Sequence, residues 1–310
     1  MPEPDLGLRL TPAAGAAVMS TGILSTATHM AGLRALSLAL LGLAVVGELV
    51  LGAGLTRQVL RNRPQVVADA ATPASLTGVA ATSVIGARMA VLGWTGVVWG
   101  LLAVAALLWL VLLPVVLLRW QVPTVGTSFL VCVATEGLAV LAAIAGTGTR
   151  PVLVGALAAF LLGLVLYAVV VARFDWRQLK VGAGDHWVLT GALAIAGLAG
   201  AELVESSTRG GLLHDLRQPL RVLDLALWVA AVAGYLLLAV CELRWPRPRY
   251  DIRRWATVFP MGMTAAATFA VAGAERVPGL TVLGHVLLWP GVAAWALVAA
   301  GALRRRFGPA

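Results

Sequence analysis

The sequence is poor in charged and aromatic side chains. Of its 310 residues, only 12% are charged and 6% are aromatic, whereas 60% are hydrophobic and the mean hydropathy is +0.92. Ordinary soluble domains contain about 25% charged residues, so this composition argues against a soluble fold. Apolar stretches of about twenty residues recur from end to end, and in lipid each of them must form a helix to satisfy its own backbone. The sequence therefore predicts an all-α integral membrane protein.

Catalytic and metal-binding motifs are also lacking. Cys132 and Cys241 lie in apolar segments without CxxC or Cys/His spacing, so we expect both to be buried. His29 and His285 have no second ligand at metal-binding spacing, and we predict neither a metal nor a cofactor. No HExxH pair, GxSxG nucleophile, aspartate-rich prenyltransferase motif or GxxxxGK[ST] loop occurs. An intramembrane enzyme is therefore the less favoured class, and ATP hydrolysis is not expected.

Ten apolar windows of 21 residues fill the chain, and we interpret residues 1–310 as a single transmembrane domain with short tails. The windows begin near Pro12, Leu36, Ala74, Val98, Gly126, Val152, Asp185, Leu223, Arg253 and Val282. The even windows contain 34 leucines and the odd windows contain 10. Ser and Thr show the reverse, with 2 in the even windows and 16 in the odd windows. Leucine suits contact with lipid, and small or hydroxyl residues suit contact between helices. This alternation predicts five helical hairpins whose odd helices face inward around a central path.

The net charge of +9 is distributed unevenly between the two ends of the predicted helices. Sixteen basic residues fall on the side of the N-terminus and seven on the opposite side. Because basic residues gather in cytoplasmic loops, this asymmetry predicts that both termini are cytoplasmic. Because the cytoplasmic loops account for the positive net charge, we do not expect nucleic acid as a partner. We expect a multi-pass protein of the cytoplasmic (plasma) membrane, with the lipid bilayer and small anions as its partners.

Four segments resemble one known family, the tellurite-resistance and dicarboxylate transporter family. The family includes the plant slow anion channels and yeast-type malate and sulfite carriers. The first inner segment reads PAAGAAVMSTGI, and the third reads GTSFLVCVATEGLAV. The fourth reads DHWVLTGALAI, and the fifth, YDIRRWATVFPMGMTAAAT, is the closest match to the family pattern. The order of the motifs and the helices that carry them also agree with the family.

The resemblance implies ten helices in five hairpins around a quasi-fivefold central pore, and a homotrimer in which each subunit has its own pore. It also implies that an aromatic side chain of the ninth helix blocks the pore, and the matching residue is Phe259, before Pro260. Phe269 is the competing aromatic residue. Other residues expected to line the path or to bring charge to it are Thr21, Gly22, Arg88, Thr135, Glu136, Gly191, Pro260 and Thr264.

Arg88 and Glu136 are ionisable residues inside two predicted inner helices. A rise of 1.5 Å per residue places them about 21 and 15 Å above the starts of their helices, and a charge at that depth is costly. We expect the two to pair, either as a neutralising ion pair alone or with Arg88 also attracting anions. Glu136 stands where the family pattern usually has glutamine. It therefore leaves open an alternative, a proton-coupled dicarboxylate or sulfite carrier.

Overall fold

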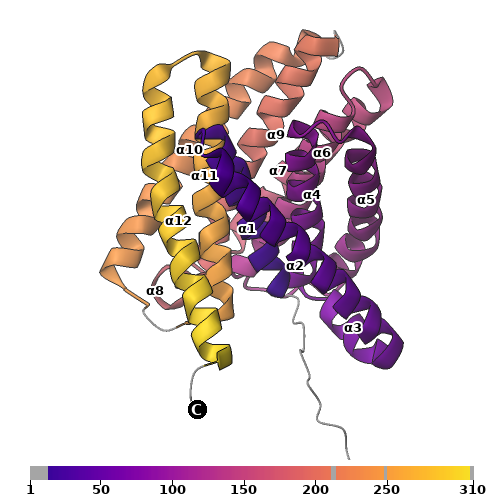
Figure 1. Ribbon diagram of the computed structural model, residues 1–310, viewed down its shortest axis with the longest axis vertical. Helices are drawn as coiled ribbons and strands as arrows, with labels where there is room; N and C mark the ends of the chain where they lie inside the picture. Colours follow the sequence, from indigo (N-terminus) through magenta and orange to yellow (C-terminus); the bar gives the residue numbers. More distant parts are fainter. Residues whose placement is uncertain (1–12, 211–213, 248–249, 308–310) are drawn as a thin grey trace, which may run out of the picture.

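The computed structural model describes residues 13–210, 214–247 and 250–307, so the predicted terminal tails lie outside the described residues. Within these ranges, nine helices are long and apolar enough to cross a membrane. A further helix of 17 residues, α1, corresponds to the first predicted window. Most of the long helices run roughly along one axis of the molecule, whereas α1 and α2 cross it obliquely (Figure 1). In lipid, such helices satisfy the hydrogen bonds of their own backbone.

Consecutive long helices pack against each other as hairpins. The pairs are α1 (Ala14–Met30) with α2 (Arg34–Arg61), α4 (Thr77–Val91) with α5 (Thr95–Leu118), α6 (Leu130–Ala145) with α7 (Arg150–Ala172), α9 (Val188–Gly210) with α10 (Arg217–Arg244), and α11 (Trp255–Glu275) with α12 (Pro278–Phe307). Two short helices, α3 (Arg63–Ala70) and α8 (Gln178–Val181), lie in the connections. Neither was predicted from the sequence, because both are shorter than the windows that hydropathy detects.

The first helices of the five hairpins form a closed ring. α1 contacts α4, α4 contacts α6, α6 contacts α9, α9 contacts α11, and α11 contacts α1. In the spans that contain α4, α6, α9 and α11, between 67% and 89% of the residues are buried, whereas the partner helices are 17% to 28% buried. Most residues of α1 are also buried. The prediction that the odd helices face inward is therefore confirmed, and the leucine-rich helices form the surface around them.

Glycines allow the ring helices to approach closely. A Cβ atom on Gly22 of α1 would lie 3.0 Å from a methyl group of Val84 of α4. A Cβ atom on Gly262 of α11 would lie 3.0 Å from a methyl group of Leu24 of α1. Lipid provides no hydrophobic drive for helices to associate, so close packing through small residues holds them together instead. Glycines of the odd windows thus lie at the contacts between ring helices.

Each of four ring helices begins with a turn of 3-10 helix at the same end of the molecule. The turns η1 (Pro73–Leu76), η2 (Gly126–Phe129), η3 (Asp185–Trp187) and η5 (Ile252–Arg254) lead directly into α4, α6, α9 and α11. η1 contacts η2, and η2 contacts η3. α3, α8 and the end of α12 lie at this lower end of the molecule (Figure 1). The repeated turn is a further sign of an internal repeat.

Indole groups of three outer helices form hydrogen bonds to the next hairpin. In three hairpins, a tryptophan Nε1 of the outer helix donates to a threonine hydroxyl on the following ring helix. The bonds are Trp109 to Thr135 at 2.9 Å, Trp228 to Thr268 at 3.0 Å and Trp295 to Thr21 at 2.9 Å. The last bond joins the fifth hairpin to the first. Because a buried indole N–H needs an acceptor, these bonds fix the order in which the hairpins close the ring.

Gly126 marks the tightest contact between two of the turns, and its replacement by alanine is expected to be strongly destabilising. A Cβ atom there would lie 2.2 Å from the carbonyl carbon of Asp185, which is backbone and cannot rotate away. We expect Gly126→Ala to cost about 1–3 kcal/mol, the usual range for overpacking. Gly42→Ala in α2 is the control, because nothing lies within 4 Å of its added Cβ. Thermal unfolding in detergent should show a loss for Gly126→Ala only; equal unfolding temperatures would contradict the described approach of η2 to η3.

Candidate functional site

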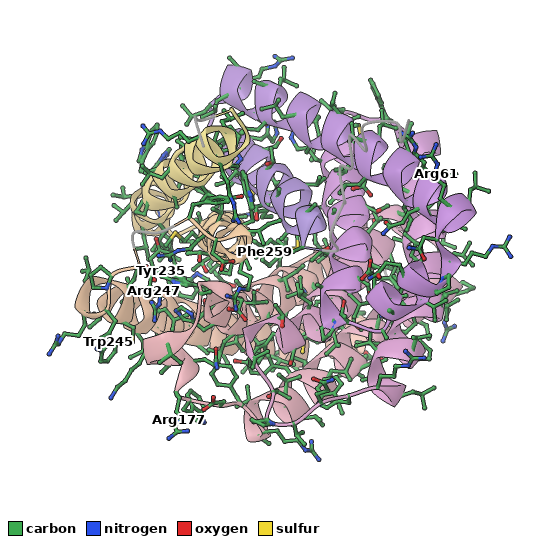
Figure 2. The ribbon with its side chains drawn as sticks, turned by 90° about the horizontal axis from the view of Figure 1, so that it is seen from below. Arg61, Arg177, Tyr235, Trp245, Arg247 and Phe259 are labelled. Atoms are coloured by element: carbon green, nitrogen blue, oxygen red, sulfur yellow. The ribbon has the colours of Figure 1, made fainter. Side chains whose placement is uncertain are left out.

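Phe259 lies near the middle of the molecule when it is viewed from the lower end (Figure 2). It belongs to α11, one of the ring helices, and its side chain is fully buried. Pro260 follows it and provides no N–H to the helix ladder, so the preceding turn of α11 lacks one backbone hydrogen bond. Thr264 donates its hydroxyl to the carbonyl oxygen of Pro260 at 2.8 Å. The sequence therefore places a bulky ring at the point where the helix is least regular.

Gly191 of α9 faces Phe259 and Pro260 where α9 packs against α11, its neighbour in the ring. A Cβ atom on Gly191 would lie 2.8 Å from Cγ of Pro260 and 3.2 Å from Cδ1 of Phe259. These three residues were predicted separately, from motifs on two different helices, and the structure brings them into contact. The missing side chain of Gly191 leaves the space that the aromatic ring and the proline occupy.

Thr21 and Thr135 were predicted to line the central path, and in the structure their hydroxyl groups contact the outer helices of neighbouring hairpins. Both hydroxyls accept the N–H of an outer-helix indole, from Trp295 and Trp109 respectively. Each also donates to the carbonyl four residues earlier on its own helix, at 2.7 Å. The hydroxyls therefore lie at contacts between hairpins. Gly22 likewise lies at the contact between α1 and α4, where its missing side chain makes room for Val84.

The predicted ion pair between Arg88 and Glu136 does not form. Arg88 donates to the hydroxyl of Ser37 in α2, from Nη2 at 3.0 Å and from Nε at 3.3 Å. Both carboxylate oxygens of Glu136 lie without a hydrogen-bond partner. A Cβ atom on Gly163 of α7 would be 2.3 Å from Oε1 of Glu136, so this carboxyl group lies against its own hairpin partner. The two side chains leave the ring in different directions.

Glu48 is a third ionisable residue within a membrane-spanning helix. Its Oε1 accepts a hydrogen bond from the hydroxyl of Thr82 at 2.7 Å, which joins α2 to α4. It lines a largely apolar cavity of about 560 Å³ between α2, α4 and α5. Glu48 thus points toward protein, and its partner is a hydroxyl group of the next hairpin.

A cluster of charged residues at the lower end was not predicted from the sequence. Glu242 near the end of α10 pairs with Arg247 at 3.0 Å and with Arg254 at 2.8 Å. Arg247 also donates to the carbonyl oxygen of Leu179 at 2.7 Å. The cluster thus joins the connections that enter α9 and α11. Its only sequence signal is the basic segment that follows α10, which the positive-inside rule already explains.

A hydrogen bond connects the loop before α9, at the lower end, to the turn of α11 that carries Phe259. Thr257, two residues before Phe259, donates to the carbonyl oxygen of Gly184 at 3.0 Å. Gly184 has a φ of 116°, a value that glycine adopts readily and other residues avoid. Nearby, Asp251 caps η5, and its hydrogen bonds from Arg253 hold its pKa below the usual range. The cap is therefore ionised at neutral pH, and its stabilising effect is lost as the pH falls through that lowered pKa.

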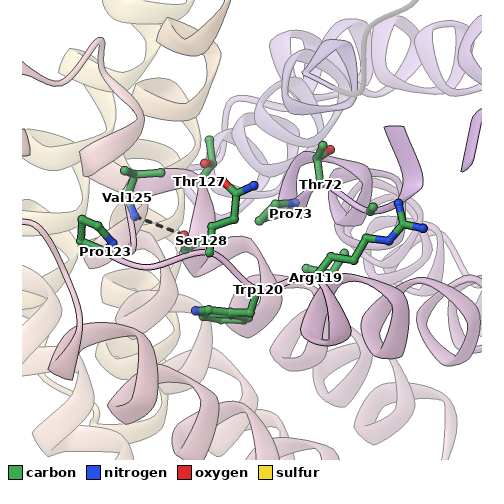
Figure 3. A pocket seen from close by; sticks show the side chains of 11 residues that line it. Thr72, Pro73, Arg119, Trp120, Pro123, Val125, Thr127 and Ser128 are labelled. Atoms are coloured by element: carbon green, nitrogen blue, oxygen red, sulfur yellow. Dashed lines mark hydrogen bonds between the residues drawn. The ribbon is translucent and has the colours of Figure 1, made fainter. Parts of the chain in front are cut away.

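A smaller cavity of about 220 Å³ lies at the lower end between the second and third hairpins (Figure 3). Arg119 and Trp120 from the end of α5 lie on one side of it, and Thr72 and Thr127 from the turns η1 and η2 on the other. Ser128 holds η2 in shape by accepting the N–H of Val125 at 3.2 Å. The cavity is lined by the connections and not by Phe259 or Gly191.

Comparison with known protein families matches residues 9–303 to the family described as SLAC1, voltage-dependent anion channel. The chain belongs to this family. The matched range contains the five hairpins almost entirely, so the assignment covers the ring, Phe259 and the lower-end cluster together. It confirms the resemblance that the four motifs indicated. A search of curated proteins finds no match.

Membership of the voltage-dependent anion channel family assigns the chain to the multi-pass membrane proteins that transport anions, not to the intramembrane enzymes. In the part of the chain that the structure describes, no group of three or more His, Cys, Asp and Glu side chains lies close enough to hold a metal ion.

Proposed function

We propose that small anions cross the membrane through a path enclosed by α1, α4, α6, α9 and α11, and that Phe259 forms its constriction. The observation that supports this proposal is the closed ring of mutual contacts between five buried helices, with Phe259 at its centre. In this view the chain has ten membrane helices arranged as five hairpins with quasi-fivefold symmetry. Weakly polar walls bind an ion loosely enough for it to leave again, as conduction requires.

The cationic lower end supports anions as the transported class. Arg119, Arg177, Arg247 and Arg254 all belong to the connections at this end, and the family is one of anion channels. Positive charge at a pore mouth raises the local concentration of anions and lowers that of cations. We propose that the protein lies in the plasma membrane with this end facing the cytoplasm. We also propose that it assembles as a homotrimer with one path in each subunit.

Flux from liposomes tests the proposed function. Purified protein reconstituted with internal chloride, nitrate, sulfite or malate is expected to release at least one of these anions faster than protein-free liposomes do. Potassium release from the same preparation is the control for leakage and should not rise. Correctly inserted protein that passes none of the anions, or that passes potassium equally well, would contradict the proposal.

A proton-coupled carrier of dicarboxylates or sulfite is the second candidate, and Glu136 is the observation that favours it. Its carboxyl group is buried at mid-membrane, and neither oxygen has a hydrogen-bond partner. Such a group is costly when charged and is neutral when protonated. If it carries the proton, an inward pH gradient should drive anion uptake in the native protein, and Glu136→Gln should abolish this response. A gradient response that persists in Glu136→Gln would exclude Glu136 as the proton carrier.

A further inference from the structure

Arg88 is a buried cation whose charge nothing in its described surroundings neutralises. It lies in the last turn of α4, and only 1% of its surface is exposed. Its Nε and Nη2 atoms both donate to the hydroxyl of Ser37, which is a neutral group. Its Nη1 atom is buried and has no hydrogen-bond partner. In the described parts of the chain, no carboxylate lies within 4 Å of this guanidinium.

The neighbouring hydroxyl groups are committed to each other. Ser37 donates to the carbonyl oxygen of Ser25 at 2.7 Å, and Ser25 donates to the carbonyl oxygen of Ser37 at 2.8 Å. This reciprocal pair joins α1 to α2 and supplies only one acceptor atom to Arg88. The carbonyl end of α1 and the N–H end of α2 meet nearby, so their opposite dipoles largely cancel. The full positive charge of the guanidinium therefore remains.

The other ionisable groups near Arg88 are basic. His29 lies in the last turn of α1, within electrostatic range of both Arg88 and Arg34. Arg34 begins α2 and is exposed. A buried charge without a counterion is costly, and a guanidinium does not relieve that cost by losing its proton in proteins. A mobile anion is the partner that would compensate it.

We propose that a compact monovalent anion such as chloride binds at Nη1 of Arg88, in the angle between α1, α2 and α4. The site lies beside the ring, on the side of α4 that faces the first hairpin, and apart from Phe259. Ser37 occupies the Nε–H and one N–H of Nη2, and both N–H groups of Nη1 remain free. Because Nη1 is fully buried, a compact halide suits the site better than a bulkier carboxylate or sulfate. The inference rests on the proposed function only for the route by which the ion arrives.

Binding of radioactive chloride to the detergent-solubilised chain tests the inference without any need for flux. Arg88→Gln is expected to lose one bound chloride per chain or to weaken its binding by at least about tenfold, since a charge-assisted hydrogen bond is lost. Arg34→Gln removes a nearby exposed charge and should bind as the native protein does. Equal binding by native protein and Arg88→Gln, or equal losses in both variants, would overturn the inference.

Ser37→Ala supplies a second test whose effect has the opposite sign. It frees Nε and Nη2 of Arg88, so chloride should bind more tightly than in the native protein, and an unchanged affinity would contradict the site. This test remains valid if Arg88→Gln does not fold. The two proposals also fail separately. Anion flux without Arg88-dependent binding would overturn the site alone, whereas binding without any anion flux would overturn the proposed function alone.

Discussion

Phe259→Ala is expected to release chloride from liposomes at least about tenfold faster than the native protein. The phenyl ring is fully buried where α11 meets Gly191 of α9, and in the proposed path it fills the space that an ion would cross. A tenfold change corresponds to a barrier lowered by about 1.4 kcal/mol. Removing an entire aromatic ring from a hydrophobic constriction, and letting water enter in its place, should lower the barrier by at least that amount. The measurement is the initial rate of chloride efflux per inserted protein.

Phe269→Ala is the matched control. Phe269 lies on the same helix and is nearly as buried, but its ring packs against Gly284 and His285 of α12, with ring centroids 5.2 Å apart in the latter contact. It therefore faces the outer helix of its own hairpin. Chloride efflux from Phe269→Ala should match that of the native protein. An equal increase in both variants, or none in folded Phe259→Ala, would remove Phe259 from the constriction.

Gly163→Ala is expected to destabilise the protein by about 1–3 kcal/mol. The added Cβ atom would lie 2.3 Å from Oε1 and 2.6 Å from Cδ of Glu136, and this carboxyl group is enclosed where α6 meets α7. The side chain would have to move or the helices would have to separate. Gly155→Ala is the control on the same helix, because nothing lies within 4 Å of its added Cβ. Thermal unfolding in detergent should separate the two variants.

Shortening Glu136 should relieve the clash. The double variant Gly163→Ala, Glu136→Ala is expected to be less destabilised than the sum of its single variants, with a coupling of about 0.5–3 kcal/mol, as residues in contact usually show. Strict additivity would mean that Glu136 does not lie against Gly163.

The inward position of the odd helices could be predicted because contact with lipid favours some residue types and disfavours others. Leucine is tolerated against acyl chains, whereas a threonine hydroxyl such as that of Thr264 must find a partner within the protein. The motif around Phe259 identified a residue that is fully buried on a ring helix, and its role as the constriction stays a prediction. Both predictions depend on which helix a residue occupies and not on its direction around the helix axis.

The directions of the buried charges could not be predicted in the same way. Height along the helix placed Arg88 near Glu136, but Arg88 follows Val84 by four residues and shares its face of α4, toward the first hairpin. The next residue along from Glu136, Gly137, instead faces Ser83 of α4, so Glu136 itself points elsewhere. Rotation about the helix axis depends on tertiary packing, which residue composition does not encode.

The reversal potential of Phe259→Ala in a planar bilayer tests the central claim most directly. With unequal chloride concentrations on the two sides, an anion path through the ring predicts a current that reverses near the chloride equilibrium potential and a smaller current of the same selectivity in the native protein. A current that reverses near the potassium equilibrium potential, or no current from correctly inserted Phe259→Ala, would contradict an anion path closed by this side chain.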